Sequence, residues 1–165
     1  MKEIIEGKAW VLGDNIDTDI IIPAKYLQIE DINELAKHTM EYFNSSFAAD
    51  VEPGDVIVAG ENFGSGSSRE QAVLVLKTLK LGAIICRSCS RIFFRNALNN
   101  GLPVITINNS IDKIKQGDRL RIIFKKGLIK NLICNKELSF KSFSEFELNL
   151  MGKGGVINLL KNLGN

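Results

Sequence analysis

A glycine-rich segment near the middle of the chain carries residue types suited to chemistry on an anion. Residues 60–70 read Gly-Glu-Asn-Phe-Gly-Ser-Gly-Ser-Ser-Arg-Glu and stand between an apolar stretch and a helical pattern. A loop in this position directs backbone N–H groups and the positive end of the helix dipole at an anion. Arg69 can bind a carboxylate through two hydrogen bonds, and backbone donors around a serine stabilise its alkoxide form. The segment therefore indicates an anion site with serines and an arginine at a helix start.

Familiar glycine-rich motifs do not fit this segment. A P-loop ends in Gly-Lys-Ser/Thr, and no lysine lies between Lys37 and Lys77. The dinucleotide-binding pattern requires glycine where Arg69 stands, and none of the serines has the flanking glycines of a hydrolase elbow. A structural alternative stays open, because Ser67 and Glu70 have the spacing of a capping box that would only close the helix.

Cysteine and histidine give weaker signals. Cys86 and Cys89 have CxxC spacing and Cys134 is a third thiol, whereas zinc sites usually take four Cys or His ligands and His38 is the only histidine. Cys86 ends an apolar stretch, where a thiol serves as a small apolar side chain. We therefore expect no metal site in this chain and place His38 on a helix surface.

Two acidic residues precede a run of three isoleucines. We predict that residues 20–22 form a buried strand ended by Pro23. Strand alternation then places Asp17 and Asp19 on one side, either as a paired acid site or as turn-capping carboxylates.

The elements that must position these residues alternate between strands and helices. The central region predicts strands at 55–60, 83–86 and 102–107 and helices at 68–80 and 90–100. Before it we expect a strand at 8–12, a helix at 32–43 capped by Asp31 and a loop at 47–53. After it the pattern predicts strands at 119–124 and 128–134 joined at a glycine turn, an ambiguous stretch at 140–150 and a helix at 156–163. This order is typical of an α/β centre with a β-rich periphery.

Length and composition limit the class of protein. The chain has 165 residues, of which 45% are hydrophobic and 24% charged, too apolar for a disordered chain and too charged for a membrane-embedded one. No apolar run approaches the roughly 18–20 residues of a spanning helix. The acidic N-terminus does not resemble a signal peptide, and three cysteines argue against a disulfide framework. We expect a single domain over residues 1–165, in the cytoplasm.

The positive charge of the chain is concentrated in its last third. Residues 112–165 carry eleven basic and five acidic side chains, whereas residues 1–111 are net acidic. A basic region can bind nucleic acid, but here few aromatic residues accompany the lysines. We interpret the charge as a solvated face, with an RNA-binding regulator as the alternative from a different class.

Three segments, in this order along the chain, resemble the small-subunit family of 3-isopropylmalate dehydratases. They are residues 15–23, 60–72 and 90–97. This family is a stand-alone swivelling domain of the aconitase superfamily, and the chain length resembles its short archaeal-type version. The resemblance implies a single swivelling β/β/α domain of aconitase C-terminal-domain type, with a core at 8–125 and a β-hairpin and terminal helix within 112–165.

The resemblance also implies an activity and a site. It implies one subunit of a hydro-lyase that isomerises 2-isopropylmalate to 3-isopropylmalate, in leucine biosynthesis, by dehydration and rehydration. A [4Fe-4S] cluster is expected on a large partner subunit, with no cofactor or metal on this chain and no nucleic acid or membrane as partner. By motif position Ser67 would be the general base and Asp19 a second catalytic residue, and Ser68 and Arg69 would bind substrate.

Substrate choice is expected to lie in residues 25–30, which follow the isoleucine run and precede a helix. In the resembling family the position of Gln28 is often apolar in isopropylmalate enzymes and arginine in homoaconitases. Gln28 offers no cation to a third carboxylate and its methylenes can line an alkyl pocket. Together with Lys25 as a substrate-binding residue, this favours isopropylmalate; the alternative is a small subunit of homoaconitase or of another 2-alkylmalate dehydratase.

Overall fold

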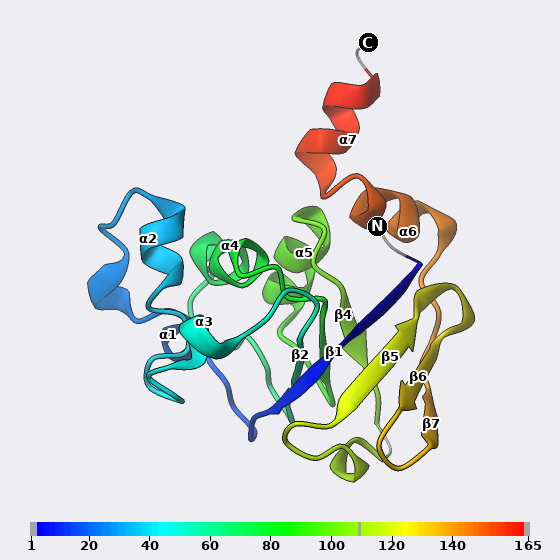
Figure 1. Cartoon of the computed structure of the whole chain (residues 1–165). Helices are drawn as coiled ribbons and strands as arrows, with labels where there is room; N and C mark the ends of the chain where they lie inside the picture. The colour runs from blue at the N-terminus through cyan, green and yellow to red at the C-terminus, as the bar shows by residue number, and fades with distance from the viewer. Residues whose placement is uncertain (1–2, 109, 164–165) are drawn as a thin grey trace.

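Seven strands form one curled sheet (Figure 1). The computed structural model describes residues 3–108 and 110–163, the last two of them by backbone only. Across the sheet the strand order is β4-β3-β2-β1-β5-β6-β7. The strands are β1 (Ile4–Val11), β2 (Val56–Val58), β3 (Ala83–Cys86), β4 (Val104–Thr106), β5 (Arg119–Ile123), β6 (Leu128–Asn131) and β7 (Lys136–Ser139).

The sheet changes direction at β1. On one side β1 pairs parallel with β2, Ala9 lying opposite Val56, and on the other it pairs antiparallel with β5, Gly7 lying opposite Leu120. β2, β3 and β4 continue in parallel, whereas β5, β6 and β7 run antiparallel. Parallel neighbours need a crossover connection, which α4 (Glu70–Thr78) supplies between β2 and β3 and α5 (Arg91–Asn99) between β3 and β4.

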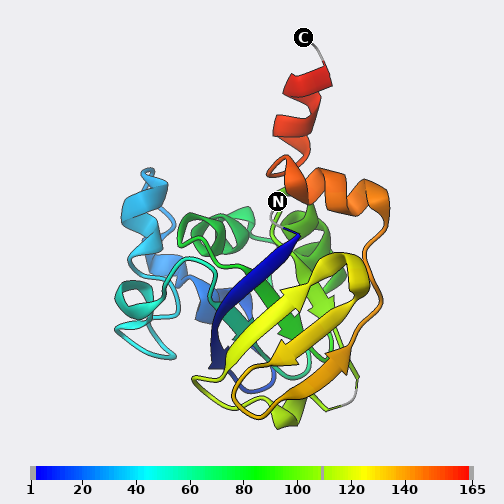
Figure 2. The same cartoon turned by 45° about the vertical axis from the view of Figure 1, so that its right-hand side comes forward.

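The two faces of the parallel strands bury different cores, because side chains alternate along a strand. Ile57 and Ile84 pack with the apolar residues of α4 and α5. Val56 and Ile85 point the other way and pack with Ile122 and its neighbours on the antiparallel strands. Those strands curl across this second face, as Figure 2 shows. The layers are β/β/α, which confirms the expected α/β class.

Short helices complete the chain. They are α1 (Thr18–Ile21), α2 (Ile32–Ala36), α3 (Phe47–Asp50), α6 (Glu145–Gly152) and α7 (Val156–Leu163), with 3-10 turns η1 (Ala24–Tyr26), η2 (Ile111–Lys113) and η3 (Phe124–Lys126). α2 packs against α4 and α6 against α5. α7 projects away from the sheet in both views (Figures 1 and 2).

The structure corrects the predicted strand at residues 20–22. Ile20 and Ile21 belong to α1, because the Asp17 side chain caps the helix by accepting from the Ile20 N–H at 2.9 Å, and Ile22 is the C-cap residue. The alternation that was to place Asp17 and Asp19 on one side of a strand therefore does not apply. The loop expected at 47–53 contains α3, and β7 was not predicted. The terminal helix, the Asp31 cap and the glycine turn of the β5–β6 hairpin are confirmed, with Gly127 at φ +59°.

Candidate functional site

The glycine-rich loop, residues 60–69, leaves the carboxyl end of β2 and leads into α4. In an open sheet the carboxyl ends of parallel strands share one edge, where ligands bind. Backbone hydrogen bonds tie the loop to the ends of β1 and β3: the Gly64 N–H donates to the Ile16 carbonyl at 2.7 Å, and the Phe63 N–H donates to the Ser88 carbonyl at 3.0 Å. The structure thus brings the three segments of the resemblance together at one edge of the sheet.

Glycine is required at the centre of this loop. Gly64 has φ +69°, and a Cβ there would lie 2.3 Å from the ring of Phe93, which is buried on α5. Phe63 fills the same space, with its ring edge-on to that of Phe93 at 5.2 Å between centroids. Gly66 has φ +92°. The loop therefore lies on an aromatic base that fixes where the following serines emerge.

The capping box left open as an alternative for Ser67 and Glu70 does not form. α4 begins at Glu70 with Arg69 as its N-cap residue, and no side chain caps this helix start. Ser67 and Ser68 are exposed, and the backbone of Ser67 is fixed instead, since its carbonyl accepts from the Thr18 hydroxyl at 3.1 Å. The Ser67 hydroxyl is accordingly not used to cap the helix, whose N-terminal end it precedes.

Arg69 and Asp19 form a two-pronged ion pair beside these serines. Arg69 Nη1 donates to Asp19 Oδ1 at 2.6 Å and Nη2 donates to Oδ2 at 3.2 Å. The Arg69 side chain is 17% exposed and that of Asp19 54%. The hydrogen bond from Arg69 lowers the pKa of Asp19, so this carboxyl is ionised at neutral pH and is a weak base. Asp19 therefore holds the Arg69 guanidinium in a fixed orientation beside the serines.

The loop predicted to set substrate choice begins at the same pair. The Ala24 N–H donates to Asp19 Oδ1 at 3.2 Å. The Lys25 side chain pairs with Glu41, with Nζ 3.0 Å from Oε1. The hydrogen bonds with Glu41 and Tyr26 raise the pKa of Lys25. Gln28 is exposed in the turn after η1. Glu41 is the functional candidate that sequence reasoning missed, because no motif links it to a loop sixteen residues earlier.

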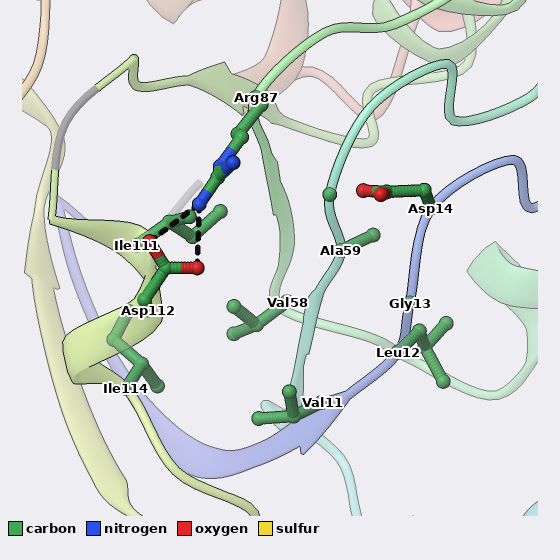
Figure 3. A pocket seen from close by; sticks show the side chains of 11 residues that line it. Val11, Leu12, Gly13, Asp14, Val58, Ala59, Arg87, Ile111, Asp112 and Ile114 are labelled. Carbon is green, nitrogen blue, oxygen red and sulfur yellow. Dashed lines mark hydrogen bonds and ion pairs between the residues drawn. The ribbon is translucent and has the colours of Figure 1, made fainter.

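A cavity of about 340 Å³ lies at the same edge of the sheet. Figure 3 shows the Arg87 side chain reaching the carboxylate of Asp112 in this cavity, with Asp14 on the other side of Ala59. Asp14 Oδ1 accepts from the Glu61 N–H at 2.7 Å and so holds the second residue of the glycine-rich loop. Arg87 is thus paired with Asp112 across this cavity.

The residues of this chain do not fit an iron–sulfur cluster. Within 3–108 and 110–163, no group of three or more His, Cys, Asp or Glu side chains could hold a metal ion. Cys86 is buried, and its hydrogen bond to Cys89 together with burial raises the pKa of its thiol, which disfavours the thiolate that binds iron. Cys134 is exposed after β6. Among the described helices, none is long and apolar enough to cross a membrane.

Residues 13–110 match the Aconitase C-terminal domain family. The chain is 48% identical over 160 residues to a 3-isopropylmalate dehydratase small subunit of Nautilia profundicola, covering 97% of this chain and 96% of the relative. It is 47% identical over 158 residues to a methanogen homoaconitase small subunit of Methanothermobacter thermautotrophicus, covering 96% and 91%. The relatives are thus matched over nearly their whole length.

A solved structure has the same fold. It is that of 3-isopropylmalate dehydratase from Methanocaldococcus jannaschii, 45% identical in sequence, with a TM-score of 0.91 over 98% of this chain and 95% of that one. This likeness extends beyond residues 13–110 and includes the antiparallel strands and C-terminal helices.

Proposed function

Because the chain belongs to the family of 3-isopropylmalate dehydratase small subunits, within the Aconitase C-terminal domain proteins, we propose that it isomerises 2-isopropylmalate to 3-isopropylmalate together with a large subunit. The reaction is the removal and re-addition of water, which moves a hydroxyl to the neighbouring carbon. The observation that carries the proposal is the position of Ser67. Its side chain is exposed and does not cap α4, and it lies two residues before Arg69, whose guanidinium is oriented by Asp19. A cytoplasmic location is part of the same proposal.

Ser67 is the general base of this proposal. Removing a proton from the carbon beside a carboxylate needs a strong base and donors that compensate the developing charge. Ser67 stands before the N-terminus of the nine-residue helix α4, whose dipole favours an alkoxide there. Arg69 binds a substrate carboxylate, Ser68 adds a hydroxyl donor beside it, and Asp19 keeps the guanidinium in position.

The site requires a second chain. The cavity between the glycine-rich loop and α5, lined among others by Ser67 and Arg69, measures about 10 Å³, room for about one water molecule. A dicarboxylate does not fit this cavity, which supports a substrate chamber completed by the partner. We place the [4Fe-4S] cluster on that large subunit, where it would act as Lewis acid on the departing hydroxyl.

The identity of the substrate rests on the loop that follows α1. Gln28 is exposed and uncharged and Lys25 is paired with Glu41, so the loop presents no free cation to a third carboxylate. This supports isopropylmalate over a homoaconitase substrate, although one relative bears the homoaconitase name. Lys25 contributes its methylene stem rather than its charge to the substrate pocket.

The RNA-binding alternative has less support. Basic residues of the last third pair with carboxylates, Arg121 with Glu6 at 2.5 Å and Lys130 with Glu137 at 2.6 Å. Pairs of this kind leave less net charge for a phosphate backbone.

The experiment is a reconstituted assay with Ser67→Ala. We expect turnover of isopropylmalate by the two-subunit enzyme to fall by at least two orders of magnitude, since general-base catalysis contributes about 10²–10⁴-fold. The melting temperature of the small subunit should stay unchanged, because no cap is lost. Ser139→Ala, at an exposed serine on β7, a strand that carries none of the site residues, is the matched control. Near-normal kcat in Ser67→Ala would contradict the proposed base.

A further inference from the structure

One carboxylate gathers three side chains around the loop that follows α1. Glu41 accepts from Lys25 Nζ at 3.0 Å and from the Tyr26 hydroxyl at 2.8 Å, and its Oε2 lies 3.2 Å from His38 Nδ1. The rings of Tyr26 and His38 stack at 3.7 Å between centroids, 15° apart in plane. Lys25 Nζ also lies 4.6 Å from the Tyr26 ring centroid and 5.3 Å from that of Tyr42. The direction in which Lys25 points is therefore fixed on several sides.

This cluster is linked to the candidate site by the backbone. Lys25 directly follows Ala24, whose N–H donates to the same Asp19 oxygen that accepts from Arg69. A lysine next to that point of the chain would be a cation beside the guanidinium that binds substrate. Glu41 draws the ammonium toward the α2 side instead. The roles proposed for Ser67, Arg69 and Asp19 do not involve Glu41.

We propose that Glu41 is a positioning residue for substrate specificity: by holding and neutralising Lys25, it denies a third substrate carboxylate its cation, and the site favours an uncharged side group. The inference rests on the proposed function. The Lys25–Glu41 ion pair carries no net charge, so a third carboxylate meets no net attraction there. Position 28 of the loop has no cation, because Gln28 is uncharged, and Glu41 neutralises the cation at position 25.

The test compares two substrates in the reconstituted enzyme. Glu41→Gln keeps an oxygen acceptor for Tyr26 but removes the charge. We expect the ratio of kcat/KM for a homoaconitate-type tricarboxylate to that for isopropylmalate to rise about tenfold. The double variant Glu41→Gln/Lys25→Met should lose most of this gain. Glu34→Gln, which breaks the exposed ion pair with Lys37 in α2, is the matched control and should leave the ratio unchanged.

Two results would overturn the inference while leaving the proposed function intact: normal isopropylmalate turnover with an unchanged ratio in Glu41→Gln, or a gain that survives in full in the double variant.

A third measurement does not need turnover. The hydrogen bonds from Tyr26 and Lys25 lower the pKa of Glu41 to about 2, so NMR titration of the isolated chain should find this carboxyl well below its usual range. An ordinary pKa would refute the network itself, whereas absence of isopropylmalate turnover in the wild-type enzyme would refute only the proposed function.

Discussion

At the scale of single residues, the site depends on the shape of a guanidinium as much as on its charge. Arg69 uses two nitrogens on the two oxygens of Asp19, which fixes the plane of the fork before any substrate arrives. An ion pair at an exposed carboxylate adds little stability. Its value lies in orientation, since a guanidinium already in place loses less freedom when it binds a carboxylate.

Arg69→Lys should therefore raise KM for isopropylmalate by about tenfold or more, because an ammonium cannot reproduce the two parallel hydrogen bonds. Steady-state kinetics of the reconstituted enzyme measures this effect. Arg119→Lys, at an exposed arginine on β5, serves as the control. An unchanged KM in Arg69→Lys would show that substrate is bound elsewhere.

Gln28 carries the second prediction at this scale. Gln28→Arg places a permanent cation in the exposed turn after η1, and one charge-assisted hydrogen bond is worth on the order of tenfold in kcat/KM. We expect preference to shift by that factor toward homoaconitate-type acids, measured as the ratio for the two substrates. If the wild-type enzyme already prefers the tricarboxylate, the cation comes from another residue and the assignment of Gln28 is wrong.

At the scale of elements, the glycine-rich loop and α5 act as one unit. Gly64→Ala would place a methyl group within 2.3 Å of the buried Phe93 ring at a positive φ, and neither the ring nor the backbone can yield without disturbing the core. We expect a loss of about 2–4 kcal/mol in the free energy of unfolding, measured by urea denaturation. Gly13→Ala is matched to it, since a Cβ at Gly13 meets nothing within 4 Å. Equal stability of the two variants would contradict the close packing.

Sequence patterns predicted the elements whose structure depends on local signals. The helices α4 and α5 and their flanking strands follow from hydrophobic periodicity and glycine positions, and the site residues follow from the motif they share with a family. The isoleucines at 20–22 have strong β propensity, but the cap from Asp17 makes Ile20 and Ile21 helical, and only Ile22 keeps an extended backbone. Ser67 and Glu70 satisfy the spacing of a capping box, and only the helix start at Glu70 excludes it. Glu41 was not predicted, because Lys25 and Tyr26 meet it from fifteen or sixteen residues away through tertiary contacts.

At the scale of the whole molecule, the proposed function assigns this chain one part of an active site. Its cavity at Ser67 is far too small for a dicarboxylate, and no described cluster could hold a metal. We expect the purified chain alone to bind no iron and to show no dehydratase activity, and addition of a cluster-bearing large subunit to restore turnover. Iron analysis, visible absorbance and the coupled assay measure these outcomes. Stoichiometric iron–sulfur absorbance of the isolated chain that survives Cys86→Ala would contradict this division of labour.

The position of β1 has a consequence for how the chain is made. This first strand needs partners on both sides, at residues 56–58 and at residues 119–123. A growing polypeptide on the ribosome can pair β1 with β2 and β2 with β3 early, but the other edge of β1 stays open until β5 has emerged. An uncovered strand edge attracts other chains, and long-range pairing is slow. Nascent chains from which β5, ending at residue 123, has not yet emerged should therefore be the most prone to aggregate and the most dependent on chaperones. The β5–β7 meander contributes no site residue, but it completes the fold.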